Sequence, residues 1–147
     1  MKRAWWLIVP IVFLAVAAPS KLNAKDKELE PFRGTWKLAA FELEGKQLDI
    51  DDFKETRLTV QGDAFTMTTA AATYKGTFKI DSAKKPKTID MTFTDGPEKG
   101  KTSLGIYEID GDTWKVCIGL TGKERPKEFA TKAESGHALE VLKREKP

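Results

Sequence analysis

The side chains that build common catalytic and metal sites are scarce in this 147-residue chain. It has one cysteine, Cys117, and one histidine, His137. A single cysteine excludes an intramolecular disulfide framework, and one cysteine with one histidine is too small a set for a typical transition-metal site. No nucleophile motif accompanies the histidine, which disfavours triad and general acid–base chemistry. We therefore expect no enzyme activity, no catalytic residue, no cofactor and no metal.

The first residues have the features of a secretory signal peptide. The positively charged start Met1–Arg3 precedes an apolar run of about 15 residues, and small residues follow. Such a run is short for a bilayer span, which needs roughly 20 residues. Residues 1–24 are the predicted signal peptide. Cleavage after Ala24 is favoured over cleavage after Ala18, because Pro19 would follow the second cut, and an uncleaved N-terminal anchor is the alternative.

A basic surplus is also lacking once residues 1–24 are set apart. They contain three of the 25 basic residues and no acidic residue, which leaves 22 residues of each sign in the rest of the chain. Without a basic stripe that has interleaved aromatic residues, nucleic acid is a poor candidate partner. We expect export, with no transmembrane span after cleavage.

The remaining sequence predicts strands joined by short turns. Residues 25–30 are predicted to be a disordered leader, residues 31–147 one domain, and residues 49–55 a short helical turn capped by Asp49 or Asp51. Alternation of apolar and polar residues predicts eight strands, at residues 34–43, 57–61, 64–69, 74–80, 88–94 and 137–144 and in the two arms of a hairpin at 105–118. Short connections favour an all-β fold, a single eight-stranded up-and-down antiparallel barrel.

One hairpin pattern occurs twice. Residues 105–118 alternate apolar side chains on either side of Asp110-Gly111, a favoured turn sequence. The same pattern, position for position, is found in Leu58–Met67. The repeat keeps the turn and the apolar face but not the polar atoms of Tyr107 and Trp114. We interpret the hairpin as a wall of the barrel.

The first strand changes phase halfway along its length. Trp36, Leu38 and Ala40 share one face, whereas Phe41 and Leu43 have the opposite parity. Such a slip predicts a bulge or bend, which a curved sheet requires. The last strand carries the apolar residues Leu139 and Val141.

Several motifs resemble a known family. Gly34-x-Trp36 in the first strand, with Lys143 or Arg144 in the last, resembles the lipocalin pattern, in which the tryptophan closes the barrel floor under a basic side chain. The wider set of motifs is Gly34-Thr-Trp-Lys, Gly62-Asp63, Lys85-Pro86-Lys87-x-Ile89-Asp90, Gly105-Ile-Tyr107, Gly111-Asp112, Cys117 and Arg125-Pro126-x-x-Phe129. It is similar to an uncharacterised lipocalin-like domain that is abundant in planctomycete bacteria. The resemblance implies a small β-barrel exported to the periplasm or exterior of a bacterial cell, and it carries no established activity, cofactor or catalytic residue.

The predicted interior leaves two binding hypotheses open, beside the disfavoured one of an enzyme site built from two carboxyls or from Tyr107 with Arg125. It is rich in aromatic rings, which either fill the barrel or leave a pocket at one mouth. The first hypothesis is a small apolar or amphipathic ligand in that mouth, and the candidate ligand-binding residues are Trp36, Phe78, Phe93, Tyr107, Trp114 and Arg125. The alternative is a filled barrel that binds a cell-envelope protein through the lysine-rich loops 81–87, 95–101 and 121–127.

Two of the candidate residues also have structural interpretations. Arg125 either guards the barrel mouth or ties a loop to backbone carbonyls or to a carboxylate such as Glu128. Cys117 is predicted to lie on the outer face, alongside Ile106 and Lys115. There its thiol is either shielded under a loop or free to pair with a second chain.

Overall fold

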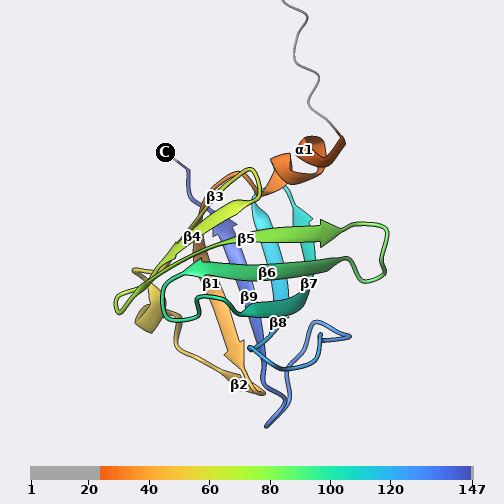
Figure 1. Cartoon of the computed structure of the whole chain (residues 1–147). Helices are drawn as coiled ribbons and strands as arrows, with labels where there is room; N and C mark the ends of the chain where they lie inside the picture. Colours follow the sequence, from red (N-terminus) through yellow and green to blue (C-terminus); the bar gives the residue numbers. More distant parts are fainter. Residues whose placement is uncertain (1–23, 147) are drawn as a thin grey trace, which may run out of the picture.

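Eight antiparallel strands close into a barrel, as the sequence predicts (Figure 1). The structure is a computed structural model that describes residues 24–146. Neighbouring barrel strands are joined in chain order, and β9 pairs with β1 to close the sheet, whereas β2 pairs only with the end of β1. The strands are β1 (Gly34–Leu43), β2 (Lys46–Gln47), β3 (Arg57–Gln61), β4 (Ala64–Thr68), β5 (Thr73–Asp81), β6 (Thr88–Asp95), β7 (Thr102–Asp110), β8 (Thr113–Gly119) and β9 (His137–Arg144).

The β3–β4 hairpin turns at Gly62-Asp63, as its predicted strands require, whereas the β7–β8 hairpin turns one residue later than the predicted Asp110-Gly111. Asp110 pairs with Thr113, so that the two loop residues are Gly111-Asp112, and Gly62-Asp63 is the equivalent loop of the first hairpin. Both glycines have positive φ, at 56° and 60°. A glycine at the first loop position matches a type II′ turn, whose twist suits antiparallel strands. Trp114 therefore pairs with Ile109 across the hairpin.

The predicted bulge in β1 is present and shapes the barrel wall. The register between β1 and β9 shifts between Leu38 and Ala40. Beyond the shift, Phe41 faces the barrel interior. This half of β1 separates from β3, and the 3-10 helix η2 (Ile50–Phe53) lies against it, with the Phe53 ring centroid 5.0 Å from that of Phe41. The Asp49 carboxylate caps η2, which confirms the predicted helical turn.

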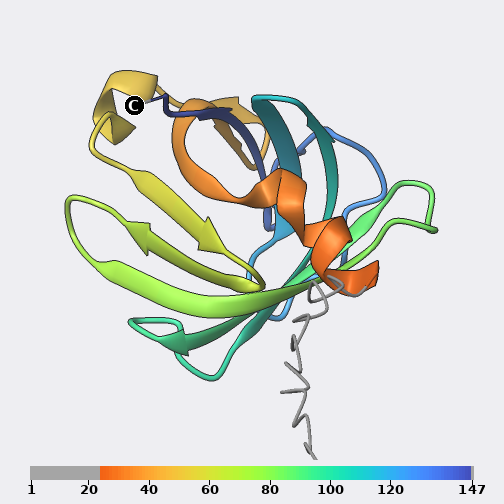
Figure 2. The same cartoon turned by 90° about the horizontal axis from the view of Figure 1, so that it is seen from above.

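Residues expected to be a disordered leader instead close one end of the barrel. They form the helix α1 (Ala24–Leu29), which continues into the 3-10 helix η1 (Glu30–Phe32). Leu29 and Phe32 are 6% and 1% exposed. Figure 2 shows both helices lying across this end. Burial of these two apolar side chains, which a disordered leader would leave in water, is the physical reason for the difference.

Phe32 is the centre of the packing at this closed end. Its ring makes edge contacts, with centroid distances of 5.0–5.4 Å, to the rings of Phe78, Tyr107 and Trp114. Edge-to-face pairs of this kind add roughly 0.5–1.5 kcal/mol each beyond the area they bury. The closed end is therefore filled by side chains, as the filled-barrel hypothesis expects.

The basic residue predicted over Trp36 is Arg144. Its guanidinium carbon lies 4.3 Å from the centre of the Trp36 ring, and its nitrogens donate to the carbonyls of Pro31 and Arg33. Gly34 gives this guanidinium room, because a Cβ at that position would lie 2.9 Å from Nη1 of Arg144. Gly34 also has a φ of 121°, which L-residues with a side chain rarely adopt. The Gly-x-Trp pattern thus has a steric explanation here.

The predicted signal peptide lies outside the described residues, except for Ala24 at the start of α1. Among residues 24–146, no helix is long and apolar enough to cross a membrane.

Candidate functional site

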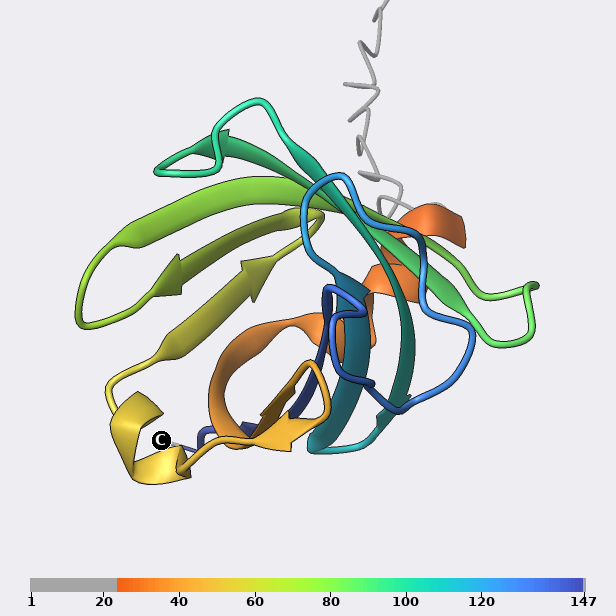
Figure 3. The same ribbon diagram turned by 90° about the horizontal axis from the view of Figure 1, so that it is seen from below.

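The end of the barrel opposite α1, the open end, contains a cavity of about 530 Å³. Figure 3 shows the barrel from this side. Small-molecule sites commonly have volumes of roughly 300–1,000 Å³. Every strand of the closed barrel contributes to the lining, which consists of Phe41, Leu58, Phe65, Met67, Tyr74, Met91, Phe93, Glu98, Lys101, Ser103, Trp114, Val116, Ile118, Leu120, Thr121, Ala138, Glu140 and Leu142. The interior is filled at one end and hollow at the other.

Aromatic rings form one side of this cavity. The Phe93 ring centroid lies 5.6 Å from that of Phe65 and 6.2 Å from that of Tyr74. Gly76 permits the first contact, because a Cβ there would approach the Phe65 ring to 2.7 Å and the carbonyl oxygen of Thr92 to 2.1 Å. Gly76 therefore lets the Phe65 ring and β6 pack closely against β5, and the missing side chain of this glycine does not create the cavity.

One ionisable side chain interrupts the apolar wall. β9 turns Ala138, Glu140 and Leu142 toward the cavity, whereas the sequence drew attention to Leu139 and Val141 of the opposite parity. Glu140 lies level with Phe41 of β1 and Val116 of β8, its cross-strand neighbours. Both neighbours also line the cavity, so the carboxyl is flanked by apolar side chains on each adjoining strand.

The Glu140 carboxyl makes no hydrogen bond or ion pair with the described residues. It retains some contact with the hollow, but protein surrounds it on all sides. This desolvation raises the pKa of the Glu140 carboxyl from 4.5 to about 7. Two further polar groups line the same wall, the Ser103 hydroxyl and the Trp114 indole. The Trp114 Nε1–H is buried and has no acceptor within the described part of the chain.

Paired charges lie on the loops at the rim of the cavity. The Lys101 Nζ is 3.2 Å from a carboxylate oxygen of Glu98, and the Thr121 hydroxyl donates to the same carboxylate at 3.3 Å. Leu120, 44% exposed, stands beside them. The rim is thus close to neutral, and its one exposed large apolar side chain borders the entrance.

The structure distributes the six predicted ligand-binding residues over three places. Phe93 and Trp114 line the cavity. Phe78 and Tyr107 pack around Phe32 at the closed end, and the Trp36 indole donates to the Phe32 carbonyl at 2.8 Å. The sixth, Arg125, lies outside the barrel, as described next. Sequence reasoning did not single out Glu140 or Ser103. The available signal for Glu140 was Leu142, an apolar residue two positions later that points to the same face of β9.

Arg125 joins the loop between β8 and β9 to the outer wall. Its guanidinium donates to the carbonyls of Gly105 at 2.7 Å and Ile89 at 3.2 Å, and it forms an ion pair with Asp90 at 2.6 Å. These contacts match the prediction that Arg125 ties a loop to backbone carbonyls or to a carboxylate. The carboxylate is that of Asp90, whereas Glu128 was the example expected. Arg125 and Tyr107 line separate surface hollows and do not form one polar site.

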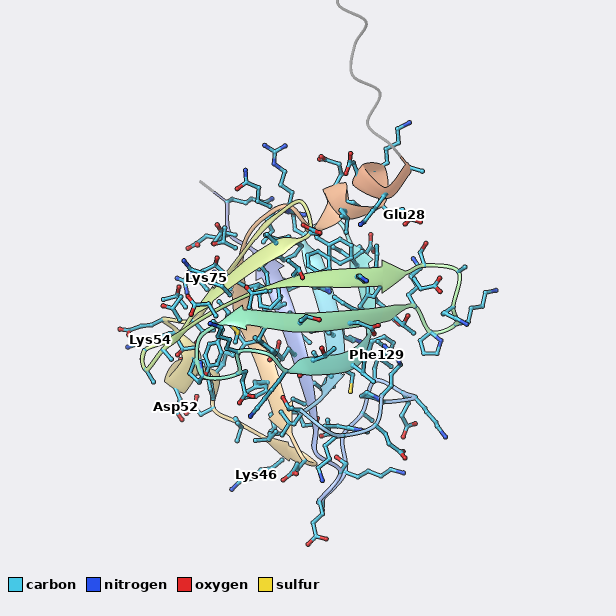
Figure 4. All side chains as sticks on the ribbon, viewed as in Figure 1. Glu28, Lys46, Asp52, Lys54, Lys75 and Phe129 are labelled. Carbon is cyan, nitrogen blue, oxygen red and sulfur yellow. The ribbon has the colours of Figure 1, made fainter. Side chains whose placement is uncertain are left out.

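Cys117 is fully buried on the outer face of the barrel. It pairs with Ile106 of β7, as its predicted parity requires, and its Sγ lies 3.7 Å from the carbonyl oxygen of Ala130. Burial raises the pKa of the Cys117 thiol to about 11. Figure 4 labels Phe129 on the covering loop, and its ring lies 5.7 Å from the Lys115 ammonium. A disulfide between chains would require this loop to move away.

The remaining candidate features are dispersed. Loops 81–87 and 95–101 connect to opposite ends of β6 and therefore do not form one continuous surface. A ring nitrogen of His137 lies 3.0 Å from the backbone carbonyl oxygen of Glu124, away from the cavity. Within residues 24–146, no three histidine, cysteine, aspartate or glutamate side chains are grouped closely enough to hold a metal ion.

Comparison with known proteins yields no match for this chain, either among protein-family models or among curated proteins.

Proposed function

We propose that this protein is an exported, lipocalin-like β-barrel that binds a small amphipathic molecule in the open-end cavity without transforming it. The observation that carries the proposal is the hollow of about 530 Å³, whose wall is mainly apolar and holds few polar groups, chiefly Glu140 and Ser103. Pockets for small molecules combine these properties, with apolar lining for affinity and a few polar groups for orientation.

The apolar lining is sufficient for useful affinity. Each methylene group removed from water contributes about 0.8 kcal/mol. A chain of about ten carbons gains roughly 8 kcal/mol in this way, before the cost of association is subtracted. About 8 kcal/mol corresponds to a dissociation constant of about 1 μM, and subtraction of an association cost of about 4 kcal/mol gives about 1 mM, so values between these limits are expected for simple amphiphiles.

Two further observations support the other parts of the proposal. A signal-peptide cut after Ala24 leaves Leu29 and Phe32 in the mature protein, so that the closed end keeps its packing. Below the rim, Glu140 is the only carboxyl on the described cavity wall, and His137 lies away from the cavity. One unpaired carboxyl, with Glu98 and Lys101 paired to each other at the rim, suits binding better than acid–base catalysis.

The test is a titration with N-phenyl-1-naphthylamine, a neutral apolar fluorophore that brightens when it leaves water. The wild-type protein is expected to bind one probe per chain. Ser103→Phe places a ring in the cavity and is expected to weaken binding at least tenfold. Thr102→Phe is the matched control, because the neighbouring Thr102 is exposed on the outer face, where its hydroxyl meets that of Thr92.

Thermal unfolding of both variants shows whether they are folded. Absence of saturable probe binding by the wild-type protein would refute the proposal. So would equal affinity of folded Ser103→Phe and Thr102→Phe.

A further inference from the structure

The carboxyl of Glu140 has no partner among residues 24–146. It stands on β9 among Phe41, Val116 and Leu142, and no described side chain or backbone group bonds to it. Glu140 is half-buried, and its carboxyl meets only the cavity, where apolar walls reduce its hydration. A poorly hydrated polar group without a partner costs free energy and calls for an explanation. The carboxyl faces a cavity large enough for a ligand, so a ligand group is a natural partner.

The charges around the cavity favour a cation over an anion. Tyr74, Glu98 and Lys101 are the other titratable groups on the described lining, and Lys101 is already paired with Glu98 at the rim. On the strands that flank Glu140, the charged side chains face outward. Glu42 of β1 accepts from Thr131 at 2.5 Å, and Lys115 of β8 lies over Phe129. No unpaired basic group therefore faces the hollow to receive a carboxylate or phosphate.

Phe41 adds a second element of cation recognition. It is the direct cross-strand neighbour of Glu140, and both residues line the cavity. The face of an aromatic ring attracts an ammonium group, and the attraction grows when water is excluded. A carboxylate beside a ring thus forms a site for an amine within a mainly apolar pocket.

We propose that the cavity selects amphiphiles that carry one basic amine, and that the ligand ammonium pairs with the Glu140 carboxylate while the apolar part packs against Phe93 and Met91. This inference rests on the proposed function and adds the chemical class of the ligand. A charge-assisted hydrogen bond in a water-poor site is strong enough to separate amines from alcohols of equal length by tenfold or more.

Pairing with Glu140 makes amine binding dependent on pH. In the ligand-free protein the pKa of the Glu140 carboxyl is about 7. Below that pH the carboxyl must therefore lose its proton before it can pair with a cation. Affinity for an amine is expected to fall by up to about tenfold per unit as the pH drops from 7 to 5, while the amine itself remains charged. An alcohol is expected to show no such loss.

The experiment measures displacement of N-phenyl-1-naphthylamine by decylamine, decanol and decanoate at pH 8, all below their micelle concentrations. The wild-type protein is expected to bind decylamine at least tenfold more tightly than decanol, and decanoate most weakly. Glu140→Gln is expected to abolish the preference for decylamine and to leave decanol binding within about threefold. Glu98→Gln, which removes the rim carboxylate, is the matched control and is expected to keep the preference.

The outcomes separate this inference from the proposed function. If decanol and the fluorophore bind but decylamine has no advantage, or if Glu140→Gln keeps the advantage, the amine site is refuted and the binding function stands. Two other results would also refute the inference: decanoate could bind more tightly than decylamine, or decanol binding could strengthen toward pH 5. Either result would indicate that Glu140 is protonated and donates a hydrogen bond to the ligand. If none of the compounds binds, the proposed function fails as well.

Discussion

Replacement of Glu140 by glutamine is expected to stabilise the ligand-free protein at alkaline pH and to have little effect on stability in acid. The side chain is partly open to the cavity but surrounded by protein, and it lacks a partner among the described residues. Glutamine has nearly the same shape and cannot ionise. The substitution therefore removes the cost of a buried charge and leaves the packing of β9 unchanged.

The size of the effect follows from the pKa of the carboxyl in the folded and unfolded chain. Burial raises it from 4.5 to about 7, and each pH unit corresponds to about 1.4 kcal/mol. The folded state holds the proton more tightly, so its stability is highest below pH 4.5 and falls as the pH rises toward 7. The full loss is about 3 kcal/mol, which is an upper value because the cavity admits some solvent.

Urea unfolding followed by tryptophan fluorescence measures this directly at pH 4.5, 6 and 8. The free energy of unfolding of Glu140→Gln minus that of the wild type is expected to rise by about 2–3 kcal/mol from the lowest to the highest pH. Glu98→Gln provides the control for loss of a negative charge near the same cavity. If the difference in unfolding free energy between Glu140→Gln and wild type stays constant from pH 4.5 to 8, the reasoning that Glu140 is a desolvated and unpaired carboxyl is refuted.

Two further predictions concern the closed end and the outer wall. Phe32→Ala is expected to lower the free energy of unfolding by about 3–5 kcal/mol, because it removes a ring that contacts three others. Urea unfolding measures this loss, and a value below about 1 kcal/mol would contradict the role of η1 in closing the barrel end. The Cys117 thiol, fully buried and with its pKa raised to about 11, is expected to react with Ellman's reagent at pH 8 at least a hundredfold more slowly in the folded protein than in urea. Rapid labelling of the folded protein would show that the covering loop opens readily.

Local patterns in the sequence were sufficient to predict most of the barrel wall. Alternation identified the eight barrel strands, because successive side chains of a strand point to opposite faces. The phase slip at Leu38–Ala40 corresponds to a real bulge. Both features depend on neighbours within a strand. The basic side chain over Trp36 was instead expected from the lipocalin resemblance, and Arg144 occupies that place.

The alternation was ambiguous where both faces of a strand are covered. In β9, Leu139 and Val141 face outward, and Leu139 lies beside the buried Cys117, its cross-strand neighbour under the covering loop. Apolar residues therefore occur at both parities, and the inward position of Glu140 was concealed. The leader was misjudged for a related reason, because only the packing of Leu29 and Phe32 against the barrel end makes residues 24–32 ordered.

By itself, the sequence determined the strand order and the closed antiparallel barrel, since short-range periodicity marks the strands and short connections make consecutive strands pair. The tertiary structure alone decided which end of the barrel is filled and which is hollow. That outcome depends on the summed volume of side chains from eight strands and on where residues 24–32 pack, and no local pattern encodes either. It also decided that a carboxyl of β9 meets the hollow, which turns an ordinary barrel wall into a candidate binding site.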